Sequence, residues 1–476
     1  MVLTARVALL ALLGVPLVAV SPWPAATFAV LLAALAVLVA IDVVLAAAPS
    51  ALDYARSGPE SARLGQPAEL RLVIRNDGAR RFRGLVRDAW APSARAEPRQ
   101  HRVDLPAGGF AVVETRLRPI RRGEQHAAAV TARSLGPLGL AGRQASRPLP
   151  GELRVLPPFL SRKHLPSRLA RLRQIDGAIP VLIRGQGTEF DSLREYVVGD
   201  DVRSIDWRAT ARRADVVVRT WRPERDRRVV LVLDTGRTSA GRVGVDPTAL
   251  DNGADAAGPF LARSSLVGPA GADAAGPFLA RSSLVGPAVG WPRLDWSMDA
   301  ALLMAALAAR AGDHVDFLAY DREPRAGVFG AGRTELLARL VDAMAPLEPA
   351  LIESDAAGMV SEVSRRTRGR ALVVILTELN ASALEEGLLP VLPQLSARHQ
   401  VIIAAVADPR VDTLAAGRAD AAQVYDAAAA ERSRNERRGI ASRLRGMGVE
   451  VVDAEPEELA PALADTYLAM KASGRL

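Results

Sequence analysis

The sequence predicts a doubly wound α/β domain in the C-terminal half, preceded by a small antiparallel β sandwich and a two-helix membrane hairpin. Two long apolar runs fill residues 1–50, short alternating segments fill 51–160, and buried strands alternate with helices over 228–476. A chain of 476 residues can hold these parts, and a hydrophobic content of 49% suffices for their cores.

The composition excludes several kinds of chemistry. The formal charge is +8, yet acidic residues are interleaved with the arginines, so we expect most charges to be paired or solvated and expect no nucleic-acid partner. The absence of cysteine excludes disulfides, thiol nucleophiles and cysteine metal ligands. The five histidines are scattered without metal-ligand spacing.

The first 50 residues predict a transmembrane helical hairpin. Val7–Val20 and Ala25–Ala48 are apolar runs, joined by a tight turn at Ser21–Pro24. Asp42 is the only charged residue of the second run. We expect it near the end of its helix, where its carboxylate reaches headgroup water.

Positive charges flank this hairpin on both sides. Arg6 precedes the first run, and Arg56 and Arg63 follow the second, so both ends are expected in the cytoplasm. The sequence therefore predicts a multi-pass protein of the cell membrane with its bulk in the cytoplasm. The alternative is a cleaved signal peptide with Arg6 in its basic region.

Residues 51–160 predict the β-sandwich-like domain. The segment "AELRLVIRNDG" places Leu70, Leu72 and Ile74 on one face and stops at a turn signal. Similar short segments follow, separated by glycine and proline, so we expect five to seven strands. No catalytic group stands out, which favours a structural or protein-contact module.

Residues 161–227 predict a linker and a block rich in charge and aromatic rings, "GTEFDSLREYVVGDDVRSIDWRATAR". Matched arginines and carboxylates favour a bidentate latch that docks the block on the next domain, with a partner-docking surface or catalysis as alternatives. Adjacent residues of a strand point to opposite faces, which argues against one ion shared by the two neighbouring aspartates. The latch or interaction residues are Glu189, Arg194, Tyr196, Asp200, Asp201, Arg203, Asp206, Trp207, Arg208 and Arg212.

Residues 228–476 predict the α/β domain. The strand "RVVLVLD" ends at Asp234, and Glu378 follows the strand "ALVVIL". Sheets of this kind bind ligands at the carboxyl ends of their strands. An insertion at about 241–292 contains one 18-residue segment twice, at Gly253–Ala270 and Gly271–Ala288. We expect it to be a tolerated, largely disordered surface insertion.

These motifs resemble the bacterial membrane proteins that contain domain of unknown function 58, whose C-terminal half is similar to a von Willebrand factor A domain. The charged block, "RVVLVLDTGRTSAG" and "PIRRGEQHAAAVTARSLGPLGL" carry the resemblance, which covers nearly the whole chain apart from the insertion. The family has no established reaction. Its members commonly occur beside MoxR-type AAA+ ATPases, which implies work with such an ATPase and its client protein.

The resemblance also implies a degenerate metal site. Von Willebrand A domains hold a divalent ion with an Asp-x-Ser-x-Ser loop, a later threonine and a later aspartate. Here Gly236 lacks one hydroxyl of the loop, and the charge of Arg237 would compete with a cation. In the alternative, the loop aspartate caps a helix or pairs with Arg237. The implied Mg²⁺ or Mn²⁺ ligands are Asp234, Thr238, Thr334 and Glu378.

Together these features predict a membrane-anchored adaptor or assembly protein with no enzymatic activity. The alternative is a metal-dependent hydrolase, which would require four carboxylates to meet in one pocket. Those carboxylates are Asp200, Asp201, Asp206 and Asp234.

Overall fold

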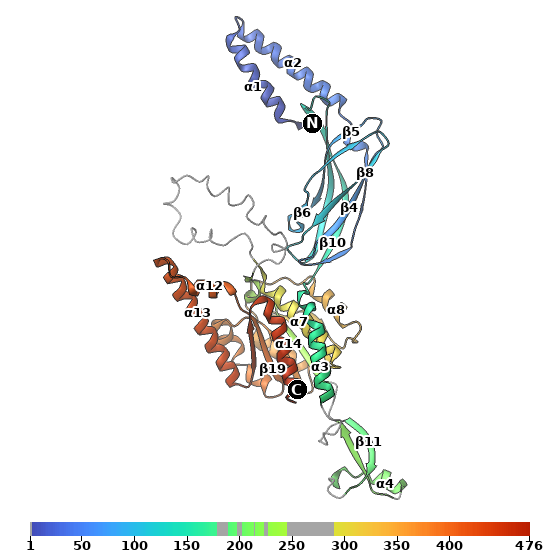
Figure 1. The fold of residues 1–476 in the computed structure, drawn as a ribbon, viewed down its shortest axis with the longest axis vertical. Helices are drawn as coiled ribbons and strands as arrows, with labels where there is room; N and C mark the ends of the chain where they lie inside the picture. Colours follow the sequence, from blue (N-terminus) through green and yellow to red (C-terminus); the bar gives the residue numbers. More distant parts are fainter. Residues whose placement is uncertain (1, 179–188, 198–201, 214, 223–226, 245–289) are drawn as a thin grey trace. The chain divides into compact units, whose positions relative to one another are not determined.

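The computed structural model divides the chain into two compact units, Met1–Leu156 and Pro157–Leu476 (Figure 1). It describes residues 2–178, 189–197, 202–213, 215–222, 227–244 and 290–476. The duplicated segment of the insertion lies outside these residues.

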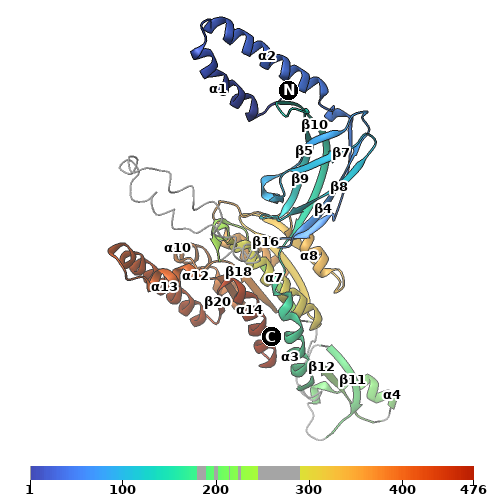
Figure 2. The same ribbon diagram turned by 45° about the horizontal axis from the view of Figure 1, so that its top comes forward.

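The first unit begins with two apolar helices, α1 (Ala5–Val20) and α2 (Pro24–Leu45), which lie side by side (Figures 1 and 2). Pro24 opens α2, where its fixed backbone angle suits the first helical turn. By length and composition α2 can cross a membrane, whereas α1 is a shorter apolar helix of 16 residues. The described chain therefore holds one candidate span where we predicted two.

Two sheets follow in the first unit, nearly all of their strands antiparallel (Figure 2). One sheet has the order β2-β4-β8-β6, and the other has the order β1-β10-β9-β5-β7 with β3 beside β10. The strands are β1 (Val2–Leu3), β2 (Leu52–Ser57), β3 (Ser61–Arg63), β4 (Ala68–Asn76), β5 (Phe82–Trp90), β6 (Ala96–Glu97), β7 (His101–Leu105), β8 (Phe110–Leu117), β9 (Gly123–Leu135) and β10 (Ala141–Leu156).

The core of this unit combines side chains from both sheets. Leu70, Leu72 and Ile74 of β4 are buried on one face, as their alternation predicts. Leu72 and Ile74 share a cluster with residues of β5, β7 and β9, including Phe82 and Val130. The β-rich region predicted for residues 51–160 is therefore present.

Asp42 lies near the end of α2, as predicted, but its carboxylate does not reach water. Its carboxylate is fully buried and accepts hydrogen bonds from the backbone N–H groups of Leu138 (2.8 Å), Leu140 (2.7 Å) and Ala141 (2.7 Å). A buried charge needs such donors in place of water. Asp42 therefore fixes the end of α2 against the turn between β9 and β10, within the compact unit Met1–Leu156.

The second unit contains a six-stranded sheet in the order β17-β16-β13-β18-β19-β20. All neighbours are parallel except β17, which is an antiparallel edge strand. In chain order this is the 3-2-1-4-5-6 arrangement of doubly wound sheets. The strands are β13 (Arg228–Asp234), β16 (His314–Tyr320), β17 (Pro324–Val328), β18 (Ala371–Leu376), β19 (Gln400–Val406) and β20 (Glu450–Ala454).

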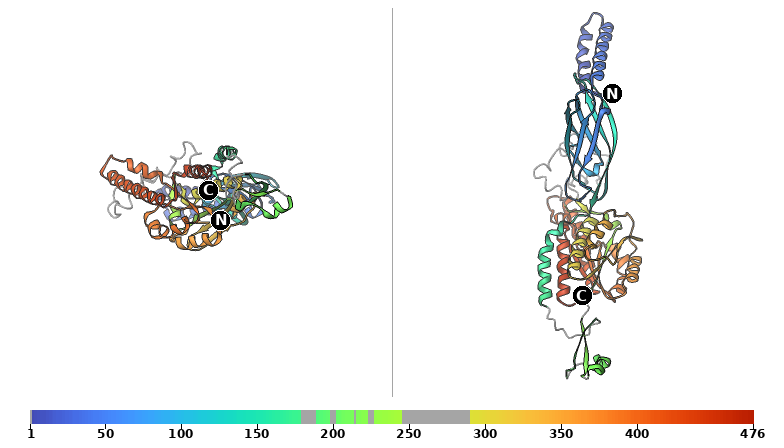
Figure 3. Two further views of the ribbon diagram at one scale, coloured as in Figure 1. Left: turned by 90° about the horizontal axis from the view of Figure 1, so that it is seen from below. Right: turned by 90° about the vertical axis from the view of Figure 1, so that its right-hand side faces the viewer.

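Helices cover both faces of this sheet (Figure 3). On one face lie α7 (Arg293–Arg310), α8 (Leu336–Met344) and α14 (Pro456–Ala472). On the other lie α9 (Ala356–Arg366), α11 (Leu392–Ser396) and α13 (Ala421–Gly446), with α12 (Pro409–Ala416) beside α13. Every residue of β18 is buried, which explains its unbroken apolar sequence.

The segment that we predicted as a linker from residue 161 is partly helical and packed. η3 (Leu160–His164) and α3 (Leu165–Ala178) lie against α7 and α14. The Ser161 N–H donates to the carboxylate of Asp299 (3.1 Å), and Arg168 pairs with Asp465 (2.9 Å). Burial raises the pKa of Asp299 to about 6.

The charged block forms a small antiparallel hairpin of β11 (Glu189–Glu195) and β12 (Val217–Arg222). Between these strands lie η4 (Val202–Ser204) and α4 (Trp207–Arg213). The described ends of the insertion meet in a two-residue ladder of β14 (Arg242–Val243) and β15 (Trp291–Pro292).

Candidate functional site

The candidate site lies at the carboxyl edge of the large sheet, where β13 ends at Asp234. β13 is flanked by β16 on one side and β18 on the other, so its end is the topological switch point of the sheet. Loops leave such a point in opposite directions and open a crevice between them. The sequence therefore directs Asp234 into the position where ligands of doubly wound sheets bind.

The Asp234 carboxylate is surrounded by hydroxyl groups. One oxygen accepts from the Gly236 N–H (2.8 Å) and from Ser354 Oγ (2.5 Å). The other accepts from Thr377 Oγ1 (2.7 Å) and Thr238 Oγ1 (3.3 Å). Only 7% of the surface of Asp234 is exposed, and these four donors satisfy its buried carboxylate oxygens.

The structure brings together part of the predicted ligand set. Asp234 and Thr238 meet as expected, whereas Thr334 is exposed in the turn before α8 and does not line the cavity. Ser354, from the segment before α9, supplies a hydroxyl that sequence reasoning missed. Thr377 was missed as well, although it directly precedes the predicted Glu378.

The loop has no hydroxyl at residue 236 because there is no room for a side chain there. A Cβ atom at residue 236 would lie 2.1 Å from Ser354 Oγ and 3.0 Å from the Ile352 carbonyl oxygen. The space beside Asp234 is thus already filled by Ser354, so the glycine is a requirement of close packing.

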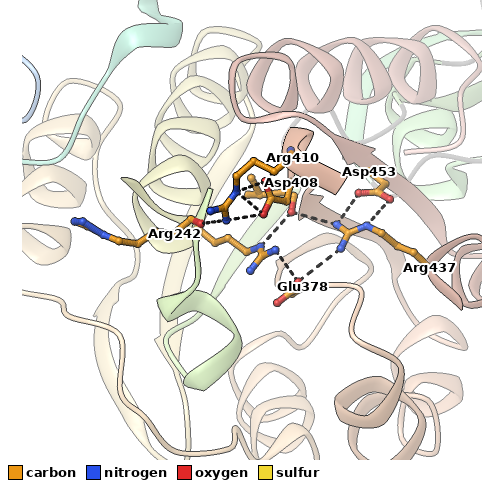
Figure 4. Close-up of polar contacts among 8 residues, drawn as sticks. Arg242, Glu378, Asp408, Arg410, Arg437 and Asp453 are labelled. Atoms are coloured by element: carbon orange, nitrogen blue, oxygen red, sulfur yellow. Dashed lines mark hydrogen bonds and ion pairs between the residues drawn. The ribbon is translucent and has the colours of Figure 1, made fainter. Parts of the chain in front are cut away.

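Glu378 takes part in a different set of contacts (Figure 4). Its carboxylate pairs with Arg293 (2.9 Å) and with Arg437 (3.7 Å), while Arg437 also binds Asp453 (2.7 Å). Burial raises the pKa of Glu378, and the two arginines oppose that rise. Both arginines also donate to the carbonyl of Val406 at the end of β19. Glu378 therefore ties three strand ends to α7 and α13, and its charge is already compensated.

A cavity of about 450 Å³ opens at this edge. The π-helical turn η10 (Leu384–Leu388) forms part of its wall, and Arg237 lies at its rim in an exposed ion pair with Glu353 (2.8 Å). The lining residues used below are Asp234, Arg237, Arg293, Ser354, Thr377 and Glu378.

The carboxylate of Asp234 and the hydroxyl oxygens of Thr238, Ser354 and Thr377 are ligands of the kind that a hard cation prefers. They supply a single carboxylate, however, and Arg237 and Arg293 line the same cavity. Within the described ranges, no three His, Cys, Asp or Glu side chains gather closely enough to hold a metal ion. The residues therefore fit Mg²⁺ or Mn²⁺ only weakly.

The predicted latch residues are spread over the small hairpin. Arg194 donates to the carbonyl of Glu195 (3.1 Å), and the Tyr196 N–H donates to Val216 (2.8 Å). Trp207 opens α4 with 68% of its surface exposed. Glu189 begins β11, Arg203 lies in η4, and Arg208 and Arg212 are exposed residues of α4, so the latch stays a prediction.

Asp206, one of the carboxylates predicted for a hydrolase, does not line the cavity. Asp206 accepts hydrogen bonds from the N–H groups of Arg208 and Ala209 (both 3.0 Å), which makes it the N-cap of α4. Asp200 and Asp201 lie outside the described residues.

The fold and its strand-end cavity define an α/β protein with a candidate ligand site at the switch point. The family described as "Protein of unknown function DUF58" matches residues 192–245 and 292–458. The match supports placing the chain in this family, as the sequence motifs predicted. No curated protein matches the chain.

Among solved structures, the chain is similar to a CARDB domain from Pyrococcus furiosus, at 15% identity over 22% of this chain and 86% of that one, with a TM-score of 0.16. It is also similar to a β-glucosidase from Listeria innocua, at 14% identity over 22% and 16% of the two chains, with a TM-score of 0.15. A β-glucosidase from Erythrobacter marinus shares 18% identity over 22% and 15%, with a TM-score of 0.15. Scores this low carry no conclusion about function.

Proposed function

We propose that the chain is a membrane-anchored adaptor whose C-terminal unit binds a protein partner at the carboxyl edge of its sheet. In this proposal α1 and α2 anchor a bacterial multi-pass membrane protein, and the bulk of the chain lies in the cytoplasm. The C-terminal unit is a von Willebrand factor A-like domain. The strand order, with its antiparallel edge strand β17, supports that relationship.

The proposal rests on the hydrogen bonds and ion pairs of the two carboxylates that line the cavity. Asp234 accepts four hydrogen bonds, and Glu378 lies between two arginines, so neither is free to act as a general base. Such a site offers shape and fixed charge to a partner. This favours binding over catalysis.

Arg237 is the cation best placed to meet a partner. It forms an ion pair with Glu353, and the two side chains are 63% and 72% exposed. Exposed pairs contribute little to stability, so a carboxylate of the partner can replace Glu353 at small cost. The partner face is then expected to carry an acidic side chain.

For the partner we propose a MoxR-type AAA+ ATPase and, through it, a client protein, as the family resemblance implies. A pull-down from detergent-solubilised membranes, with and without nucleotide, tests this proposal. The parent chain should retain the ATPase, Arg237→Glu should lose it, and Arg370→Glu, an exposed control that precedes β18, should behave as the parent. Equal recovery with all three chains would refute the assigned surface, and the absence of any ATPase would refute the partner.

A further inference from the structure

The helices join the β domain without a flexible spacer. α2 ends at Leu45, and the next two residues, Ala46 and Ala47, are already buried (2% and 6% exposed). The Asp42 carboxylate binds three N–H groups of the β9–β10 turn. The end of α2 is therefore fixed against that turn.

The start of α1 is held by the same turn. Thr4 Oγ1 donates to the carbonyls of Gly139 (2.8 Å) and Leu140 (3.0 Å), and β1 pairs with the first residues of β10. Both outer ends of the helical pair are thus bonded to one edge of the β domain (Figure 2). If α2 is embedded in a membrane, this edge must lie at the membrane surface.

Among the described residues, two arginines at this edge have no carboxylate partner. Arg80 Nη1 donates to the carbonyl of Val44 in the last turn of α2 (2.5 Å), and Arg6 Nη1 donates to the carbonyl of Leu138 (3.3 Å). Both are exposed, and neither forms an ion pair within the described part of the chain. Arg81, the next residue along the chain, is instead paired with Asp104 (2.6 Å).

Apolar side chains accompany these charges. Leu138, at the tip of the β9–β10 turn, is 45% exposed, and Phe110, at the start of β8, is 71% exposed. Phe110 lies opposite Arg75, which precedes Asn76, and Asn76 Nδ2 donates to the Arg80 carbonyl (2.9 Å). Exposed apolar residues beside unpaired arginines are typical of surfaces that rest in the interface of a bilayer.

We propose that this rim, formed by Arg6, Arg80, Leu138 and Phe110, binds the headgroups of acidic phospholipids. The inference rests on the membrane anchor proposed above. The apolar surface of α2 extends to Val44 and Leu45, which are 65% and 49% exposed, so the hydrocarbon boundary falls next to Arg80. A cation at that depth is attracted by anionic headgroups, while the leucine and phenylalanine enter the interface.

Single-cysteine labelling tests the rim, because the natural chain contains no cysteine. Leu138→Cys places a fluorophore on the rim, and Glu60→Cys places it on an exposed turn beyond the opposite end of β2. Each full-length chain is reconstituted in phosphatidylcholine vesicles with a headgroup-bound quencher, with and without phosphatidylglycerol. We expect strong quenching at residue 138, weak quenching at residue 60, and an increase at residue 138 when phosphatidylglycerol is present.

A matched pair of variants tests the role of the charges. Arg6→Gln/Arg80→Gln should abolish the response to phosphatidylglycerol, whereas Arg116→Gln/Arg154→Gln, exposed arginines at the far end of their strands, should keep it. Equal quenching at residues 60 and 138, or an unchanged response in the first variant, would overturn the proposal. Flotation of the vesicles in alkaline carbonate reports insertion separately. A chain that does not float refutes both anchor and rim, and a floating chain without quenching at residue 138 refutes the rim alone.

Discussion

Asp234 shows how a single buried charge can organise the end of a strand. Its four donors come from three segments, the loop after β13, the segment before α9 and the residue after β18. Each hydrogen bond to a charged group contributes about 2 kcal/mol. The carboxylate therefore fixes the loops that shape the cavity.

Gly236→Ser should disturb this arrangement instead of completing a metal site. The new Cβ would meet Ser354 Oγ, so we expect a loss of about 1–3 kcal/mol in the free energy of unfolding. The magnesium-induced shift in melting temperature should be small in the parent and no larger in the variant. Thermal unfolding with and without Mg²⁺ measures both quantities. Adding Ser354→Ala should relieve the clash, and a larger magnesium shift in Gly236→Ser alone would contradict this account.

The raised pKa of Asp299 predicts that the stability of the fold depends on pH. Its pKa is about 6 in the fold against 3.8 in the unfolded chain, so between these values the folded state holds a proton that the unfolded state releases. The stability contributed by this group is greatest at low pH and falls as pH rises through that window. Asp299→Asn, which does not titrate, should therefore gain stability relative to the parent as pH rises, by up to about 3 kcal/mol. Denaturation across a pH series measures the difference, and parallel curves would refute the assignment.

Only some of the individual residues of the site could be predicted from the sequence. The end of an apolar strand placed Asp234 correctly, because all residues of that strand after Arg228 are buried. It did not reveal Ser354, which reaches Asp234 from 120 positions further along the chain. The sequence also favoured Glu378 over Thr377, because carboxylates are common metal ligands. Arg293 and Arg437, which pair with Glu378 in the fold, are far from it in the sequence. Contacts between loops depend on tertiary packing that local patterns do not record.

At the scale of elements, Glu378, Arg293 and Arg437 join α7 and α13 to the ends of β18 and β19. Both side chains of the Arg293–Glu378 pair are 16% exposed. Glu378→Gln would leave two arginines facing each other without their shared carboxylate. We expect a loss of about 3 kcal/mol, measured by chemical denaturation. Glu353→Gln, which breaks an exposed pair, should cost less than about 1 kcal/mol, and equal losses would contradict this reasoning.

The duplicated segment allows a second test at this scale. β14 and β15, at the two described ends of the insertion, pair with each other. Deleting Gly253–Ala270 should leave the melting temperature and ATPase binding unchanged. A marked fall in either would show that the repeat has a structural or binding role.

The regular elements with strong periodicity were predictable, and the irregular ones were not. The unbroken apolar run of β18 and the alternation of β4 each identify a strand. β17 escaped prediction because its five residues, "PRAGV", contain proline and glycine and alternate poorly. α12 was missed because its eight residues are mostly exposed, with one buried alanine.

At the scale of the whole molecule, the proposed anchor requires both termini to lie in the cytoplasm. Arginines flank the apolar helices on both outer sides, and Asp42 and Thr4 bind the same β turn. When fused to the C-terminus, a reporter that works only in the cytosol should be active, and a reporter that works only after export should be inactive. Activity of a reporter that requires export would contradict the orientation and remove the ATPase from reach.

The most direct test of the central claim is site-specific photo-crosslinking in cells. A photoreactive amino acid at Glu353 or Ser382, both exposed beside the cavity, should link the chain to a MoxR-type ATPase. The same residue at Arg370, exposed before the start of β18, should give no such product. Mass spectrometry of the crosslinked band identifies the partner. The account predicts ATPase adducts from the two cavity positions and none from Arg370. ATPase adducts from Arg370 alone, or no adduct that contains an ATPase, would contradict it.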